Sequence, residues 1–168
     1  MNNAITTNIV RFIALVLVQV LVLNHINFLG YINPYLYILF IILFPIKNNR
    51  MLFIFLAFLL GLTVDLFTDS GGVHAAASVT IAYIRPVVLK FSFGAIYEHQ
   101  TIKFSNTDIG QRLTYFLIII LVHHLLLFSL EIFNFSKIIL ILKKTLFSCI
   151  FTLILCILIT VLFSRKTK

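Results

Sequence analysis

Six long apolar runs, separated by short polar turns, constrain this chain more than any other feature of its sequence. A helix that crosses the hydrocarbon core of a membrane needs about 20 mostly apolar residues, and soluble domains are about half apolar and a quarter charged. Here 61% of residues are hydrophobic and 11% are charged. The sequence therefore predicts an all-α, polytopic membrane helix bundle, with residues 1–168 forming a single integral membrane domain. The expected spans are 9–29, 33–46, 51–67, 72–90, 113–131 and 143–163.

The second run is the shortest, because Asn33 and Pro34 resemble a helix cap and a first helical position. That leaves a span that must tilt, thin the bilayer or be shielded by neighbouring helices. The first run follows Arg11 and lacks a small-residue cleavage site, so we expect an uncleaved first span rather than a signal peptide.

The basic residues predict the orientation in the membrane. The net charge is +8, but the basic residues stand singly or in small groups beside apolar runs, which is typical of topology signals rather than of nucleic-acid binding. With both termini in the cytoplasm, ten basic residues lie inside and three outside. The ten are Arg11, Lys47, Arg50, Arg85, Lys90, Lys103, Arg112, Arg165, Lys166 and Lys168, and the three are Lys137, Lys143 and Lys144. We therefore expect a multi-pass protein of the inner (cytoplasmic) membrane.

Tyrosines are the expected interfacial anchors, because the chain has no tryptophan. The six are Tyr31, Tyr35, Tyr37, Tyr83, Tyr97 and Tyr115. Cys149 and Cys156 fall seven residues apart in the last run, on one helical face. Helical geometry excludes a disulfide between them and predicts two small buried side chains.

Asp65 is the most informative single residue. A carboxylate near the end of a membrane span is costly unless it has a partner or reaches the interface. The turn centred between Asp69 and Ser70 places Asp65 and His74 at similar depth in an antiparallel hairpin, so contact between them is expected. The sequence leaves open a functional ionisable pair or lock and a structural, partly hydrated pair.

The run that begins after Gly72 carries small residues four apart, Gly72, Ala76 and Thr80. This spacing allows close approach of helices in lipid and predicts a central helix. The helix is expected to bend or end at Arg85 and Pro86, with Arg85 extending to the inner head groups. A substrate-binding role for Arg85 remains the alternative.

No residue cluster predicts catalysis, metal binding or a cofactor. His123 and His124 are adjacent and project about 100° apart on a helix, so they do not converge on one ion. Asn24 and His25 are expected to form interhelical hydrogen bonds or to contact water. The polar loop at 94–111 lacks a phosphate-binding or nucleophilic motif and is interpreted as a solvated connector.

The segment 61–86, GLTVDLFTDSGGVHAAASVTIAYIRP, resembles the MreD family of rod shape-determining proteins, in particular the form found in Bacteroidota. The resemblance rests on a small set of positions, and elsewhere only the hydropathy pattern agrees. The positions are Gly61, Leu62, Asp65, Gly72, His74, Arg85 and Pro86.

This resemblance implies a non-enzymatic scaffold of the cell-elongation complex, or elongasome, that contributes to cell shape and peptidoglycan synthesis. The implied partner is MreC, and through it MreB, RodA and a penicillin-binding protein. It also implies a six-helix fold similar to the substrate-binding subunits of energy-coupling-factor transporters. A vitamin-like transporter subunit is therefore the alternative function. Gly61, Asp65, Gly72, His74, Arg85 and Pro86 are carried over as structural or partner-contact positions.

Overall fold

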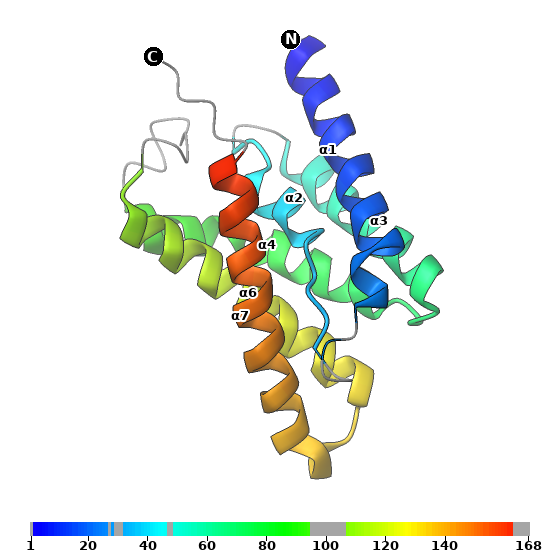
Figure 1. Ribbon diagram of the computed structural model, residues 1–168. Helices are drawn as coiled ribbons and strands as arrows, with labels where there is room; N and C mark the ends of the chain where they lie inside the picture. The colour runs from blue at the N-terminus through cyan, green and yellow to red at the C-terminus, as the bar shows by residue number, and fades with distance from the viewer. Residues whose placement is uncertain (1, 27, 29–31, 47–48, 95–106, 163–168) are drawn as a thin grey trace.

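A computed structural model describes residues 2–26, 28, 32–46, 49–94 and 107–162 (Figure 1). Within these residues the regular secondary structure is helical, apart from an isolated bridge between Phe28 and Ile32. The elements in chain order are α1 (Asn2–Leu21), η1 (Leu23–His25), α2 (Ile38–Leu43), α3 (Arg50–Thr68), α4 (Val73–Phe93), α6 (Ile109–Ile132), η3 (Phe135–Lys137) and α7 (Ile138–Leu162).

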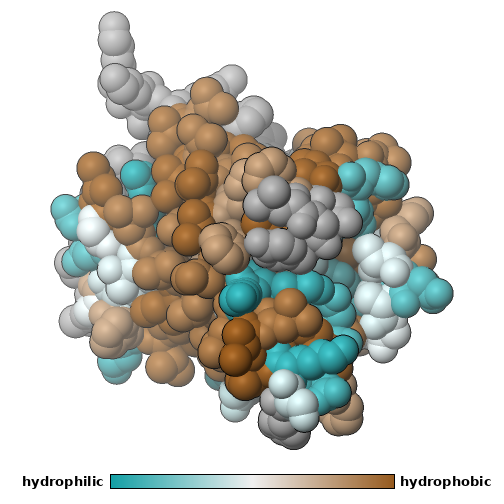
Figure 2. Space-filling model, turned by 60° about the horizontal axis from the view of Figure 1, so that its bottom comes forward, coloured by the Kyte–Doolittle hydropathy of each residue, from teal (hydrophilic) through white to brown (hydrophobic). Residues whose placement is uncertain are grey.

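Five helical segments of the described chain are long and apolar enough to cross a membrane. They are Thr6–His25, Arg50–Thr68, Val73–Phe93, Ile109–Ile132 and Ile138–Leu162. Large apolar side chains on their outer faces remain exposed, Phe55, Leu121 and Leu158 among them. Figure 2 turns the lower end of Figure 1 toward the viewer and shows a broad hydrophobic area on that face beside a hydrophilic patch. Such a surface suits lipid, so the chain has the make-up of a multi-pass membrane protein.

The predicted second span is not a continuous helix. Only Ile38–Leu43 is α-helical, and the helix begins after Tyr37 rather than at Pro34. Residues 35–42 are nevertheless buried. Irregular backbone at membrane depth is tolerated where protein surrounds it, and here the other helices enclose the segment. The prediction of a helix over 33–46 was therefore wrong in its secondary structure, although the segment lies inside the bundle.

This segment nevertheless runs back alongside α1, toward the beginning of that helix. The guanidinium of Arg11 donates to the carbonyl of Leu43 at 3.4 Å, and the amide of Gln19 donates to the carbonyl of Pro34 at 3.1 Å. The order of these contacts is antiparallel. A mostly extended chain covers about 3.3 Å per residue against 1.5 Å in a helix, so the short α2 suffices for the return.

Helix α4 lies between α3 and α6 and has its most extensive contacts with these two, in agreement with the predicted central position. Pro86 lies inside α4, which continues to Phe93, so of the two alternatives at Arg85 and Pro86 the helix does not end there, and its last residue is close to the predicted 90. The small-residue face was misassigned, because Ala76 is exposed whereas Ala77, Ser78 and Ala82 are buried.

The remaining helices overlap their predicted runs with shifted ends. Helix α1 begins earlier than 9 and ends at Leu21, and α7 begins at Ile138, earlier than the predicted 143. Cys149 and Cys156 are free and buried, as predicted. The start of α1 and the end of α7 both lie toward the top of Figure 1. Most of the predicted loop at 94–111 lies outside the described residues.

Candidate functional site

The α3–α4 hairpin is held together at Gly61. A Cβ at this position would lie 2.5 Å from the Cα of Ala75 and 2.5 Å from the carbonyl oxygen of His74. Only a residue without a side chain permits this approach of two helix backbones. Gly61 and Asp65 stand four residues apart and therefore face the same part of α4. The spacing of the Gly-x-x-x-Asp motif follows from this packing.

Asp65 belongs to α3, but its side chain caps the amino-terminal end of the next helix, α4. Its carboxylate accepts hydrogen bonds from the backbone N–H groups of His74 at 2.9 Å and Ala75 at 2.8 Å, and from the hydroxyl of Ser70. Gly72 is the N-cap of α4, with a φ of 93°, and has no side chain to cap with. Asp65 thus satisfies two of the free N–H groups at the start of α4, where a negative charge is also favoured by the helix dipole.

Asp65 and His74 do meet, but through the His74 backbone rather than its imidazole. Both residues are buried, with 4% and 5% of their surface exposed. The expectation of partly hydrated side chains was therefore wrong. Three hydrogen bonds compensate for burial of the Asp65 carboxylate.

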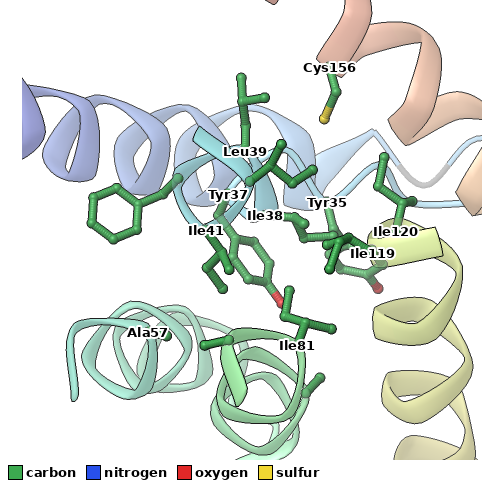
Figure 3. Close-up of a cluster of buried hydrophobic side chains, with 14 of the residues drawn as sticks. Tyr35, Tyr37, Ile38, Leu39, Ile41, Ala57, Ile81, Ile119, Ile120 and Cys156 are labelled. Carbon is green, nitrogen blue, oxygen red and sulfur yellow. The ribbon is translucent and has the colours of Figure 1, made fainter. Parts of the chain in front are cut away.

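The imidazole of His74 belongs to a second, buried polar group. The hydroxyl of Tyr37 lies 2.8 Å from Nδ1 of His74 and 2.7 Å from Nε2 of His123. A phenol carries a single proton, so one of the two imidazoles must donate to Tyr37 while the other accepts. The predicted second span, residues 33–46, is called the α2 segment from here on. In Figure 3 the Tyr37 ring points away from this segment toward α4. This hydroxyl joins the α2 segment, α4 and α6.

His124, whose ring lies 5.5 Å from that of His123, hydrogen-bonds to a separate set of partners. Its Nδ1 donates to the carbonyl of Ile120 at 2.8 Å, which leaves Nε2 to accept from the hydroxyl of Thr152 at 3.1 Å. The Thr152 oxygen in turn accepts from the backbone N–H of Tyr35 at 3.0 Å. His123 and His124 therefore serve different partners, as their helical spacing predicts. In the described part of the chain, no three His, Cys, Asp or Glu side chains are grouped to hold a metal ion.

Polar side chains satisfy the backbone of the irregular α2 segment at both ends. Gln19 accepts from the N–H of Leu36 at 2.8 Å and donates to the carbonyl of Pro34 at 3.1 Å. Its amide nitrogen also donates to Asn24 at 2.8 Å. Lipid offers no substitute for such bonds. Gln19 is fully buried and performs the role that water performs at soluble helix ends.

Arg85 performs the same role at the carboxyl end of α2. Its guanidinium donates to the carbonyls of Ile42 at 3.2 Å and of Phe44, and to the hydroxyl of Tyr115 at 2.8 Å. It also stacks over the ring of Phe53 at 5.1 Å. Only 4% of its surface is exposed, so the prediction that Arg85 extends to the inner head groups was wrong. In the described part of the chain, carbonyl dipoles are the groups that balance its charge.

The tyrosines do not all lie where the sequence placed them. Tyr35, Tyr37 and Tyr115 are buried in the bundle, and Tyr83 alone of the described tyrosines is exposed, with Arg50 over its ring at 4.9 Å. Tyr31 and Tyr97 lie outside the described residues. Sequence reasoning missed the contributions of Gln19, Tyr37 and Thr152. The signal for Gln19 was present, because an uncharged polar residue in the middle of an apolar run requires a partner in the bundle.

A pocket of about 310 Å³ opens at the end of the bundle that carries the α3–α4 turn. It is lined by Asn24, Asn33, Tyr35, Thr68, Asp69, Ser70, Val73, His74, Leu127 and Glu131. His25, in contrast, is exposed and does not line it. At the opposite end, Arg85 and Pro86 line a smaller pocket of about 230 Å³ together with Arg50.

Comparisons with protein-family models, curated proteins and solved structures give no match to this chain.

Proposed function

We propose that this chain is a non-enzymatic membrane scaffold of the MreD type, with both termini in the cytoplasm, that binds MreC in the inner membrane. Through MreC it would act with MreB, RodA and a penicillin-binding protein in peptidoglycan synthesis. The observation that supports this proposal is that the motif residues hold the bundle together. Gly61, Asp65 and Arg85 are all engaged in holding helices and the α2 segment together, as a rigid framework requires.

Partner contact in this proposal falls to exposed residues beside the hairpin. Asp65 and His74 are too deeply buried to touch another protein, so they act by shaping the turn. Leu66 and Phe67 are 76% and 65% exposed on the last turn of α3. In lipid, shape and close packing drive helix association. We therefore assign the contact with the transmembrane segment of MreC to this corner.

Site-specific photo-crosslinking tests this assignment. A photo-reactive phenylalanine analogue replaces Phe67, and a matched control replaces Leu146 on α7, which is exposed and apolar too. We expect an MreC adduct in membranes from position 67 and a much weaker one from position 146. Equal adducts from both positions would remove the corner as the contact. Failure of the detergent-solubilised protein to co-purify with MreC would remove the scaffold proposal itself.

A second candidate is the substrate-binding subunit of a small-molecule transporter. The pocket beside the α3–α4 turn favours it, because several polar side chains from different elements converge there. Mass spectrometry of the purified protein decides between the two candidates. A vitamin bound in stoichiometric amount would support the transporter subunit, and co-purification of MreC without such a molecule would support the scaffold.

A further inference from the structure

The pocket beside the α3–α4 turn has a pronounced excess of hydrogen-bond acceptors. Its lining contains two carboxylates, those of Asp69 and Glu131, and no lysine or arginine. Both acidic side chains are exposed at the mouth. Lys144 contacts Glu131 at 3.0 Å from outside the lining and offsets part of that charge. The charge of the mouth favours a cation and repels an anion.

The inner wall of the pocket includes the imidazole of His74. His74 is 5% exposed and lines the pocket, while its Nδ1 is occupied by Tyr37. The two ring nitrogens of an imidazole point in divergent directions, and no hydrogen bond within the described residues involves Nε2 of His74. The Oδ1 atom of Asn33, another lining residue, is buried and unpaired in this part of the chain. Buried polar atoms of this kind are normally satisfied.

The pocket is larger than a bare ion requires. Its volume of about 310 Å³ stands at the lower end of the range of about 300–1,000 Å³ for small-molecule sites. A desolvated metal ion also requires several convergent ligands at short distances, and the described residues group no three suitable side chains around one point. A small organic cation fits both the volume and the charge.

We propose that this pocket binds a protonated primary amine. The ammonium group lies between the carboxylates of Asp69 and Glu131, which line the mouth of the pocket. Nε2 of His74 accepts a further hydrogen bond when the imidazole proton is on Nδ1 and is donated to Tyr37. The amine belongs either to a free small molecule or to a lipid head group at the membrane surface. The inference is independent of the scaffold proposal and of transport.

The test uses the full chain in detergent and measures the midpoint of thermal unfolding, which a bound ligand raises. Ethanolamine is compared with ethylene glycol, which lacks the amine, and phosphatidylethanolamine is compared with phosphatidylglycerol. Stabilisation by ethanolamine identifies a free amine as sufficient, and stabilisation by phosphatidylethanolamine alone identifies the lipid head group. Absence of stabilisation by both amines, relative to their controls, overturns the proposal.

Three variants check that the stabilisation comes from this pocket. Asp69→Asn and Glu131→Gln each remove one carboxylate, and we expect the amine affinity to fall about two- to fivefold for each. Lys144→Gln removes the competing charge and should raise the affinity by a similar factor. Asp108→Asn, at the other end of α6, keeps a good helix cap and serves as the control. Unchanged amine affinity in all three variants would also overturn the proposal. Misfolding would lower the affinity in every variant, so it cannot explain a rise for Lys144→Gln together with a fall for Glu131→Gln.

Discussion

Gly61 on α3 lies against the backbone of Ala75 on α4, so that a Cβ at position 61 would lie 2.5 Å from the Ala75 Cα. The obstacle is backbone, which cannot rotate away as a flexible side chain can. We expect Gly61→Ala to separate the two helices and to destabilise the protein by about 1 to 3 kcal/mol, as overpacking does elsewhere. Thermal unfolding in detergent measures the effect.

The control for this prediction is Ala76→Leu. Ala76 is exposed on α4, so a larger apolar side chain there meets lipid or detergent instead of a neighbouring helix. We expect an unchanged midpoint. If Ala76→Leu proved as damaging as Gly61→Ala, the close approach of the helices would have to be on the Ala76 face after all.

Replacement of Asp65 should destabilise α4 at its first turn. Asp65→Ala leaves the N–H groups of His74 and Ala75 without an acceptor, at a cost of about 2 to 3 kcal/mol. Asp65→Asn retains one acceptor oxygen and should lose about half as much. The measurement is the midpoint of unfolding by denaturing detergent. Asp69→Asn is the matched control, since Asp69 is exposed and Asn tolerates its left-handed φ of 52°. Equal stability of Asp65→Ala and the original protein would contradict the capping role.

The sequence predicted the parts of the fold that depend on local pattern. Long apolar runs mark helices in lipid, and the small residues and glycines around Asp69 mark a tight turn, so the α3–α4 hairpin was predictable. The depth shared by Asp65 and His74 followed from their equal distance to that turn. The hydrogen bonds from the backbone of α4 to the Asp65 carboxylate could not be predicted from the sequence. A capping side chain that comes from the preceding helix stands at no fixed sequence distance from the helix that it caps.

The α2 segment was beyond prediction for a related reason. Its apolar run is as hydrophobic as a membrane helix, and the local pattern gives no sign that most of it is irregular. What permits the irregular backbone is a set of partners far away in sequence, Gln19, Arg85 and Thr152. The same partners account for the error at Arg85, which was assigned to head groups because its backbone acceptors were not recognisable from sequence.

Gln19→Leu should loosen the amino-terminal half of the α2 segment. The substitution keeps a side chain of similar size but leaves the N–H of Leu36 and the carbonyl of Pro34 unpaired. Because such groups are costly at membrane depth, we expect local opening and faster amide hydrogen exchange at Leu36 and Tyr37. Exchange in α7 provides the internal reference. Unchanged protection of these two amides would show that Gln19 does not hold the segment.

Arg85→Met should loosen the opposite end of the same segment. Methionine fills much of the space but leaves the carbonyls of Ile42 and Phe44 without a donor, at a cost of about 2 to 3 kcal/mol. Arg85→Lys should be intermediate, since one ammonium group cannot reproduce a planar fork of donors. Arg50→Met is the control, because Arg50 is exposed. Equal unfolding midpoints for Arg85→Met and Arg50→Met would contradict the role assigned to the buried guanidinium.

The return of the chain through the α2 segment predicts which residues share a side of the membrane. Single cysteines at Ile26 and Met51 flank this segment, and a single cysteine at Ser136 lies beyond α6; all three positions are exposed. The native Cys149 and Cys156 are buried and should give a low background with a membrane-impermeant maleimide. With cytoplasmic termini, positions 26 and 136 should be labelled from outside in right-side-out vesicles, and position 51 only in inverted ones. Gln111→Cys, at the start of α6, should behave like position 51. Labelling of positions 26 and 51 from the same side would mean that the α2 segment does not cross the bilayer. Only the five long helices would then cross it.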